Sequence, residues 1–237
     1  MDLPSYEEFI GKHKGDTAFV CGAGLSFYNI INHPGFERIH DHVVVSVNSS
    51  FVAMRDWDKG DPDKRYWISN DALCRWWDYW IDVKAAKANK IVRDSWKKHF
   101  KEIPDFYQFH CRPTPEDTIN SEDTGLCYCS SVPSAVDLCI QMGCKNIYIL
   151  GLDHDFDIEG RSHFWQMLNP KDQPQRIDKK LATHQEQKNA FKYNDLAFSA
   201  LRQFAIERGV SVVNCNIESK VEAFLKKPFE HIIGELR

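Results

Sequence analysis

The chain has 237 residues, 43% of them hydrophobic and 27% charged, which is typical of a globular protein with room for one α/β domain and a lid. Its formal net charge of −4 argues against general nucleic-acid binding, which needs a basic surface. The sequence shows no signal peptide, no apolar run long enough to span a membrane, and no metal-site or disulfide pattern among its eight cysteines, so we expect a cytoplasmic protein.

The first predicted strand runs into a turn that contains glycines. A leading helix over residues 6–14 precedes the apolar run 17–21, and Gly22, Ala23, Gly24 and Ser26 follow before a segment that can be helical. This order is typical of phosphate-binding turns, because glycines let the backbone approach a ligand and free N–H groups at a helix start attract anions. The third glycine of the dinucleotide fingerprint is absent, so a simple tight turn remains the alternative.

Two further strands end in polar residues. The run 43–47 is followed by Asn48 and Ser49, and the run 66–69 is followed by Asn70. Side chains at these positions can reach a ribose or a base, because ligands bind outside the carboxyl ends of the strands in open α/β sheets. The alternative for Ser49 is that it caps the short helix expected over residues 51–54.

The middle of the chain combines an aromatic stripe with a basic run. Leu73, Trp76, Trp77 and Trp80 share one face of a predicted helix, which indicates core packing, with a homo-oligomer contact as the alternative. Short strands are expected at 90–92 and 106–109. Seven basic residues between 84 and 101 indicate a solvated helix face, and peripheral contact with phosphates or lipid head groups remains open.

After a polar loop over 112–127, the segment 129–153 has the clearest pattern in the chain. Ser131 is the predicted N-cap of a helix over 132–142, Gly143 ends that helix, and an apolar strand over 146–150 leads to Asp153. An unbroken apolar strand is typical of a sheet that is covered on both faces. Asp153 and the start of this helix are therefore a predicted ligand site, although Asp153 could equally cap the next turn.

The rest of the chain predicts a long loop and a long helix. Residues 154–183 form a polar, lid-like insertion, and His184 opens a helix to about residue 208, followed by a strand over 210–214 and a short helix over 220–225. Its predicted buried stripe is Tyr193, Leu196, Ala197, Ala200 and Phe204. Alternating strands and helices predict a single nucleotide-binding α/β domain over 1–237, a three-layer sandwich with a mainly parallel, Rossmann-like sheet.

The ordered motifs CGAGLS, VNSSF and SAVDLCIQMGCKNIYILGLD, with a histidine-bearing loop after them, resemble two related families over residues 17–215. One comprises bacterial CMP-sialic-acid-dependent sialyltransferases that modify lipooligosaccharide. The other is the domain of unknown function 115, which includes motility accessory factors and archaeal 6-hydroxymethylpterin diphosphokinases. The resemblance implies a glycosyltransferase that takes a CMP-activated sugar donor and a glycan or other hydroxyl acceptor.

The resemblance also implies roles for single residues. Gly22, Gly24 and Ser26 would line the phosphates, Asn48 and Asn70 would hold the ribose and the sugar, and Ser130 and Ser131 would face the donor sugar. Ala23 and Ser49 are further nucleotide-binding candidates because of their place at the same strand ends. A loop histidine, His184 or His163, would be the general base, with Asp153 as a further catalytic candidate.

The chain departs from the sialyltransferases at two places. Ala23 stands where they usually carry Asn, and Phe156 and His163 stand where they use two tyrosines on the leaving phosphate. Asp153, Asp155 and Asp157 add carboxylates that a metal-independent transferase does not need. A diphosphokinase-like enzyme using ATP and Mg²⁺ is therefore one alternative, and a non-catalytic nucleotide-binding protein is another.

Overall fold

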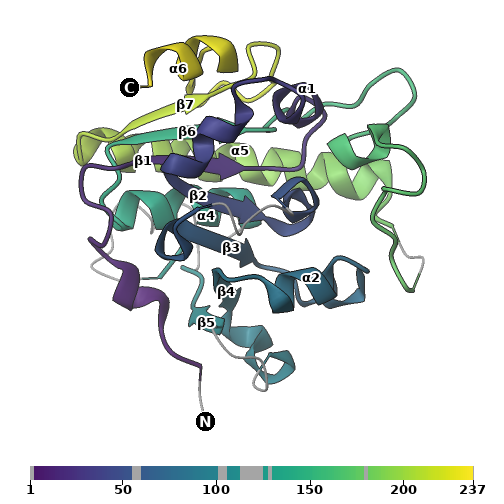
Figure 1. Ribbon diagram of the computed structural model, residues 1–237, viewed down its shortest axis with the longest axis horizontal. Helices are drawn as coiled ribbons and strands as arrows, with labels where there is room; N and C mark the ends of the chain where they lie inside the picture. Colours follow the sequence, from purple (N-terminus) through teal and green to yellow (C-terminus); the bar gives the residue numbers. More distant parts are fainter. Residues whose placement is uncertain are drawn as a thin grey trace.

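The structure is a computed structural model that describes residues 3–54, 60–100, 106–112, 125–127, 130–178 and 181–236. Its centre is an eight-stranded sheet in the order β5-β4-β3-β2-β1-β6-β7-β8, and each pairing between neighbouring strands is parallel (Figure 1). The strands are β1 (Thr17–Cys21), β2 (Val43–Val47), β3 (Arg65–Ser69), β4 (Asn89–Arg93), β5 (Phe106–Phe109), β6 (Asn146–Leu150), β7 (Ser211–Asn214) and β8 (Leu225–Lys226).

Helices cover both faces of this sheet. The α-helices are α1 (Phe27–Ile31), α2 (Trp80–Ala85), α4 (Ser131–Gln141), α5 (His184–Glu207) and α6 (Phe229–Glu235). Short 3₁₀ helices are η1 (Tyr6–Phe9), η2 (Phe36–Asp41), η3 (Asn48–Met54), η5 (Pro62–Lys64), η6 (Ala72–Trp76), η7 (Asp94–His99) and η8 (Phe164–Met167).

Successive strand residues point into two separate cores. In β1, Ala18 and Val20 belong to the core under α4 and α5, whereas Phe19 and Cys21 belong to the core under α1, α2 and α6. This alternation is the period of a strand, and burial on both faces explains the unbroken apolar runs. The predicted fold class, a three-layer α/β sandwich with a parallel sheet, is confirmed.

The strand order reverses between β1 and β6. From β1 the chain builds outward through β2 to β5, returns through α4, and then adds β6, β7 and β8 on the other side of β1. Cys21 pairs with Leu150, so both strands end at the same level. Such a switch point opens a crevice at the carboxyl edge of the sheet, and this is where ligands bind in doubly wound folds.

The predicted strands are confirmed to within one residue, but several predicted helices are wrong. Residues 6–14 form only the 3₁₀ helix η1, which ends at Phe9, and a turn after it. The helix predicted over 220–225 is absent, and β8 begins at Leu225. Lys90 is buried in β4, so the basic run is not one helix face. Three parts of these predictions lie outside the described part of the chain: Lys101 of the basic run, most of the predicted loop 112–127, and residues 179–180 of the predicted lid.

The tryptophan stripe is divided between two short helices. Because η6 is a 3₁₀ helix that ends at Trp76, the spacing of three and four residues no longer describes one face. Leu73 and Trp76 are 43% and 37% exposed, so their predicted burial is wrong, whereas Trp77 and Trp80 pack partly against the core. The homo-oligomer contact stays a prediction.

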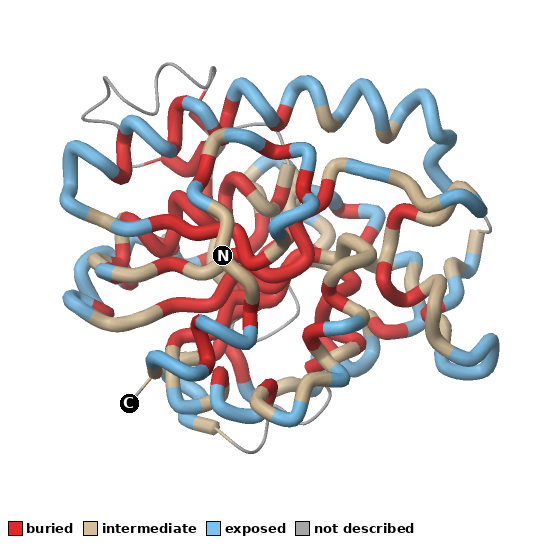
Figure 2. Tube along the Cα trace, turned by 90° about the horizontal axis from the view of Figure 1, so that it is seen from above, coloured by how far each residue is buried: buried red, intermediate tan, exposed pale blue. Residues whose placement is uncertain are grey.

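Helix α5 is confirmed over almost its whole predicted length, and it starts with a capping box between Thr183 and Glu186. No residue from His184 to Tyr193 is buried, and Asn194 is the first buried residue of the helix. Figure 2 shows this exposed N-terminal half reaching beyond the buried strands. Ala197, Ala200 and Phe204 of the predicted stripe are buried, whereas Tyr193 and Leu196 are exposed, because the buried face continues through Phe198 and Leu201.

Candidate active site

The ends of β1 and β6 are joined by backbone hydrogen bonds. The N–H of Gly22 donates to the carbonyl oxygen of Leu150 at 2.8 Å, and the N–H of Gly24 donates to that of Gly151 at 2.9 Å. A Cβ atom at Gly22 or Gly24 would lie 2.6 or 2.7 Å from the Gly151 oxygen. The two glycines therefore let the strands approach each other, and their N–H groups are occupied within the chain rather than presented to a phosphate.

Asp153 holds this turn in place. Its side chain is buried, Oδ2 accepts the N–H of Ser26 at 2.8 Å, and Oδ1 accepts Ser26 Oγ at 2.5 Å and Asn216 Nδ2 at 2.8 Å. The carboxylate thereby satisfies an N–H group that precedes α1. Asp153 therefore binds the turn after β1 and Asn216, rather than the next turn of the chain that the capping alternative named.

The polar ends of β2 and β3 meet the start of α4. Ser131 Oγ accepts the Asn70 N–H at 2.8 Å and donates to Asn48 Oδ1 at 3.3 Å. Asn70 Nδ2 donates to Ser134 Oγ at 2.9 Å, while Asn70 Oδ1 is buried without a hydrogen-bond partner among the described residues. The helix N-cap is Ser130 rather than the predicted Ser131, and Ser131 instead links two strand ends to the helix.

Two cavities lie side by side at this edge. The glycine-side cavity, of about 250 Å³, is lined by Ala23, Gly24, Val132, Asp153, His154 and Phe191 among others. The aromatic cavity, of about 340 Å³, has Trp77, Tyr79 and Trp165 in its wall, together with Arg176 and His184. Both cavities share the residues Asn48, Ser49, Ser162, His163 and Gln187. Two adjoining cavities can hold two reactants with their reacting groups at the shared wall.

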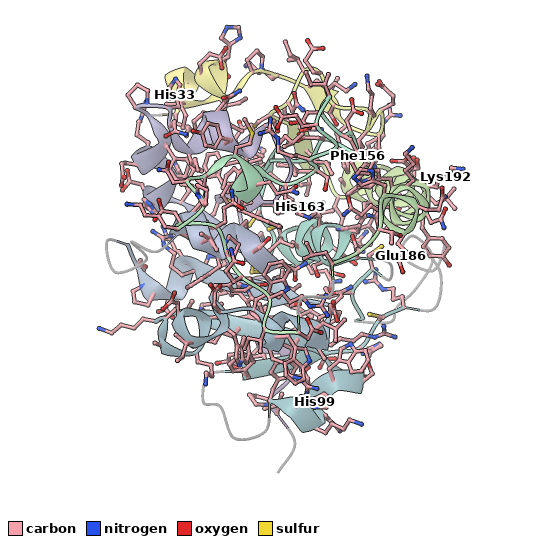
Figure 3. The ribbon with its side chains drawn as sticks, turned by 90° about the vertical axis from the view of Figure 1, so that its right-hand side faces the viewer. His33, His99, Phe156, His163, Glu186 and Lys192 are labelled. Atoms are coloured by element: carbon pink, nitrogen blue, oxygen red, sulfur yellow. The ribbon has the colours of Figure 1, made fainter. Side chains whose placement is uncertain are left out.

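His163 stands at this shared wall, and Figure 3 shows it near the middle of the carboxyl edge. Its Nδ1 lies 2.8 Å from Ser162 Oγ, which donates its own hydrogen to Gln187 Oε1 at 2.7 Å. Nδ1 therefore carries a hydrogen and Nε2 carries the lone pair. Burial lowers the pKa of His163 to about 4, so the imidazole is neutral near pH 7.

His184 lies at the exposed mouth of the aromatic cavity. Its Nε2 is 2.8 Å from the carbonyl oxygen of Gly160, to which it donates, and its ring lies 4.8 Å from the ring of Phe156. Nδ1 is then the nitrogen that can accept a proton. The contacts join the first turn of α5 to the predicted lid, and Figure 3 shows Phe156 on the side of the edge where α5 presents Glu186 and Lys192.

The structure brings most of the predicted site residues together. Ala23, Gly24 and Asp153 line the glycine-side cavity, His184 lines the aromatic cavity, and Asn48, Ser49 and His163 line both. Ser131 donates to Asn48 and accepts the N–H of Asn70, whereas Gly22 and Ser26 support the turn. Ser130 begins α4 without a side-chain cap hydrogen bond.

Sequence reasoning missed residues that come from distant segments. Gln187, Ala190, Phe191 and Asn194 face the glycine-side cavity from α5. Their offsets of three, four and seven are one helical face, which was a usable signal. Trp77, Trp165 and Arg176 meet only because residues 175–177 pair with residues 76–78. That pairing carries no local pattern in the sequence.

The three predicted acidic residues do not converge. Asp153 is bound to Ser26, Asp155 lies 3.7 Å from Lys220 Nζ, and Asp157 binds Arg161 at 2.6 Å. Among the described residues no group of three or more His, Cys, Asp and Glu side chains is placed to hold a metal ion. No helix in this part of the chain is both long and apolar enough to cross a membrane.

Comparison with known proteins finds a structural likeness and no match in sequence. No protein-family model and no curated protein matches the chain. The structure is similar to the sialyltransferase CstII from Campylobacter jejuni in complex with a substrate analogue, cytidine-5'-monophosphate, with a TM-score of 0.51 and 13% identity over 90% of this chain and 85% of that chain. The same sialyltransferase with a trisaccharide acceptor and CMP gives a TM-score of 0.47 at 12% identity, covering 88% of this chain and 84% of that one. At 13% identity the likeness to the CMP complex with the TM-score of 0.51 shows the fold alone, which is Rossmann-like.

Proposed function

We propose that the chain is a glycosyltransferase that transfers a sugar from a CMP-activated donor to a hydroxyl group of a glycan-like acceptor. The observation that carries the proposal is the pair of adjoining cavities at the switch point of the sheet. The structurally similar sialyltransferase was determined with CMP, and its fold covers 90% of this chain. Both observations support a nucleotide in the glycine-side cavity.

The proposed donor site uses the start of α4 and the turn after β1. The N-terminus of α4, at Ser130 and Ser131, carries the positive end of the helix dipole and attracts a phosphate. Ala23 and Gly24 shape the cavity floor, while Asn48 and Ser49 offer polar groups between the two cavities. The aromatic cavity suits a sugar acceptor, because aromatic walls with a few polar groups are typical of small-molecule sites.

In the proposed reaction the acceptor hydroxyl attacks the anomeric carbon of the donor. The new bond joins the acceptor oxygen to that carbon, the bond from the carbon to the phosphate oxygen breaks, and CMP leaves with the electron pair. The hydroxyl proton passes to a neutral imidazole. His163 Nε2 has the better position, at the wall between the cavities, whereas the lowered pKa makes it a weak base. His184 Nδ1 is the second candidate.

Residues 154–183 form the proposed lid. Phe164 N–H donates at 3.0 Å to the carbonyl of Ala23, which lines the glycine-side cavity, and Arg176 pairs with Trp77 in the wall of the aromatic cavity. The segment therefore contacts both cavities. Closure over bound reactants excludes water, which competes with the acceptor hydroxyl for the donor. The diphosphokinase alternative is less supported, because Asp153, Asp155 and Asp157 face different partners.

A ligand panel and turnover assays test the proposal. CMP should raise the melting temperature, and ATP with Mg²⁺ or NAD should not, because a ligand that binds only the native state stabilises it. His163→Gln and His184→Gln are then assayed for CMP release from CMP-sialic acid with and without sugar acceptors. Loss of the base should slow turnover by about two to four orders of magnitude with CMP affinity nearly unchanged. His231→Gln, on the exposed surface of α6, is the control.

The outcomes separate the functions. Stabilisation by ATP with Mg²⁺ alone would favour the diphosphokinase, and CMP binding without turnover of any donor would favour a non-catalytic nucleotide-binding protein. If both histidine variants keep wild-type turnover, neither is the base.

A further inference from the structure

A histidine and an aspartate outside the proposed catalytic set form a pair at the glycine-side cavity. His154 Nδ1 lies 2.9 Å from Asp195 Oδ1, and the ring stacks on Phe191 with 4.5 Å between centroids and 15° between planes. The His154 side chain is only 7% exposed. His154, Phe191 and Asn194 all line the cavity, so α5 fixes this imidazole in its wall.

The backbone at His154 is also unusual. Its φ is +54°, and Asn48, at +50°, is the only other non-glycine residue with positive φ in the described part of the chain. Both residues line the glycine-side cavity. Asparagine and histidine adopt the left-handed conformation more readily than most residues other than glycine, and residues in this conformation cluster at functional sites.

Asp195 determines which nitrogen of His154 carries the hydrogen. An ionised carboxylate only accepts hydrogen bonds, so Nδ1 donates to Asp195 and Nε2 keeps its lone pair. The charged groups that act on the ring are Asp195 and Asp153, and burial outweighs them, so the pKa of His154 is lowered. Near pH 7 the side chain therefore offers the cavity one hydrogen-bond acceptor and no donor.

We infer that His154, oriented by Asp195, selects a nucleobase with an exocyclic amino group, and so favours cytosine over uracil in the proposed donor. The inference rests on the proposed function. The N4 amino group of cytosine donates to Nε2, whereas the O4 atom of uracil is itself an acceptor and leaves both groups unpaired. A buried polar group without a partner costs enough to change affinity by about 10- to 100-fold.

The inference predicts a ratio of affinities, measured by calorimetric titration of the full chain with CMP and UMP at pH 7.5. The two nucleotides share ribose and phosphate, so their ratio isolates the base. We expect CMP to bind about 10- to 100-fold more tightly than UMP. His154→Asn should bring the ratio close to one, because asparagine tolerates the left-handed backbone and its amide can turn to donate or accept.

Asp195→Asn provides a second variant. Its amide can donate to Nδ1, which moves the hydrogen of the imidazole to Nε2 and turns His154 into a donor for uracil O4. The ratio should then shift toward UMP. If the pair only tethers α5 to the loop, its variants should lower the affinity for CMP and UMP by the same factor and keep the wild-type ratio. His231→Asn, exposed on α6, is the control and should keep the wild-type ratio.

Three results would overturn the inference, and they are distinguishable. Equal binding of CMP and UMP by the wild-type chain contradicts base selection while leaving the proposed function intact. A wild-type ratio in both His154→Asn and Asp195→Asn shows that other groups read the base. If neither CMP nor UMP binds, the proposed function is wrong, and the inference that rests on it is wrong as well.

Discussion

At the residue scale, Gly24 explains how the two strand ends can lie so close. A Cβ atom at this position would lie 2.6 Å from Asp153 Oδ2 and 2.7 Å from the Gly151 carbonyl oxygen. Gly24→Ala should therefore lower the free energy of unfolding by about 1–3 kcal/mol, through overpacking and loss of the Asp153 contacts. Urea unfolding followed by circular dichroism measures the change.

The matched control for this change is Gly234 in α6, where an added Cβ would meet nothing within 4 Å and the φ angle is ordinary. Gly234→Ala should leave stability unchanged or raise it by up to about 1 kcal/mol, because alanine favours helix. If both substitutions change the free energy of unfolding equally, the close contacts at Gly24 do not determine the cost of an added Cβ there.

The lowered pKa of His163 makes the free energy of unfolding depend on pH. Its pKa is about 4 in the folded chain, below the ordinary value of 6.5, because burial disfavours the charged ring. The unfolded chain binds the proton more readily. The contribution of the neutral His163 to the free energy of unfolding is therefore fully present above pH 6.5 and is lost as the pH falls toward 4. Between pH 7 and 5 this residue should remove about 1–2 kcal/mol from the free energy of unfolding.

The variant His163→Gln does not titrate, so its free energy of unfolding should fall less than that of the wild type over the same interval. Chemical denaturation at pH 7, 6 and 5 compares the two chains. Parallel curves would mean that His163 keeps an ordinary pKa in the folded state, and its assignment as a neutral base would lose its support.

At the element scale, α5 consists of two different halves. Residues 184–193 contain no buried position, whereas Ala197, Leu201 and Phe204 pack into the core against α4 and the sheet. Hydrogen exchange should therefore be fast in the first half and slow in the second, because protection follows burial and packing. Mass spectrometry of deuterated peptides from the full chain measures both halves in one experiment.

The same experiment with CMP tests the site. Gln187 and Phe191 line the glycine-side cavity, so bound CMP should slow exchange in residues 184–193 and leave α6, on the other face, unchanged. Slowed exchange in α6 alone would place the ligand elsewhere.

The elements also show which sequence signals are reliable. Runs such as Val43–Val47 are buried at each position, and this burial is why such strands could be predicted to within a residue. The two-residue strand β8 has an exposed Leu225 and was not predicted. The short helices could not, because η6 and η1 are 3₁₀ segments whose ends depend on tertiary contacts. Ala197, Ala200 and Phe204 of the predicted stripe are buried, whereas Tyr193 and Leu196 face solvent. Periodicity therefore identified the buried face of α5 but extended it too far.

At the scale of the whole molecule, the sheet topology predicted which strand ends meet at the candidate site. The ends of β1, β2 and β6 had to meet at one edge, and this brought Gly24, Asn48 and Asp153 together as expected. The chemistry of individual groups was harder to predict, since Asp153 and Ser26 satisfy each other. The pair of His154 and Asp195 joins positions 41 residues apart, and no local pattern marks such a contact.

The central claim is that the edge between β1 and β6 binds CMP, and a crystal structure of the full chain with CMP tests it most directly. The account predicts the phosphate at the start of α4, near Ser130 and Ser131, and the base against His154. A complex with CMP bound outside the glycine-side cavity, or crystals at saturating CMP that contain none, would contradict it.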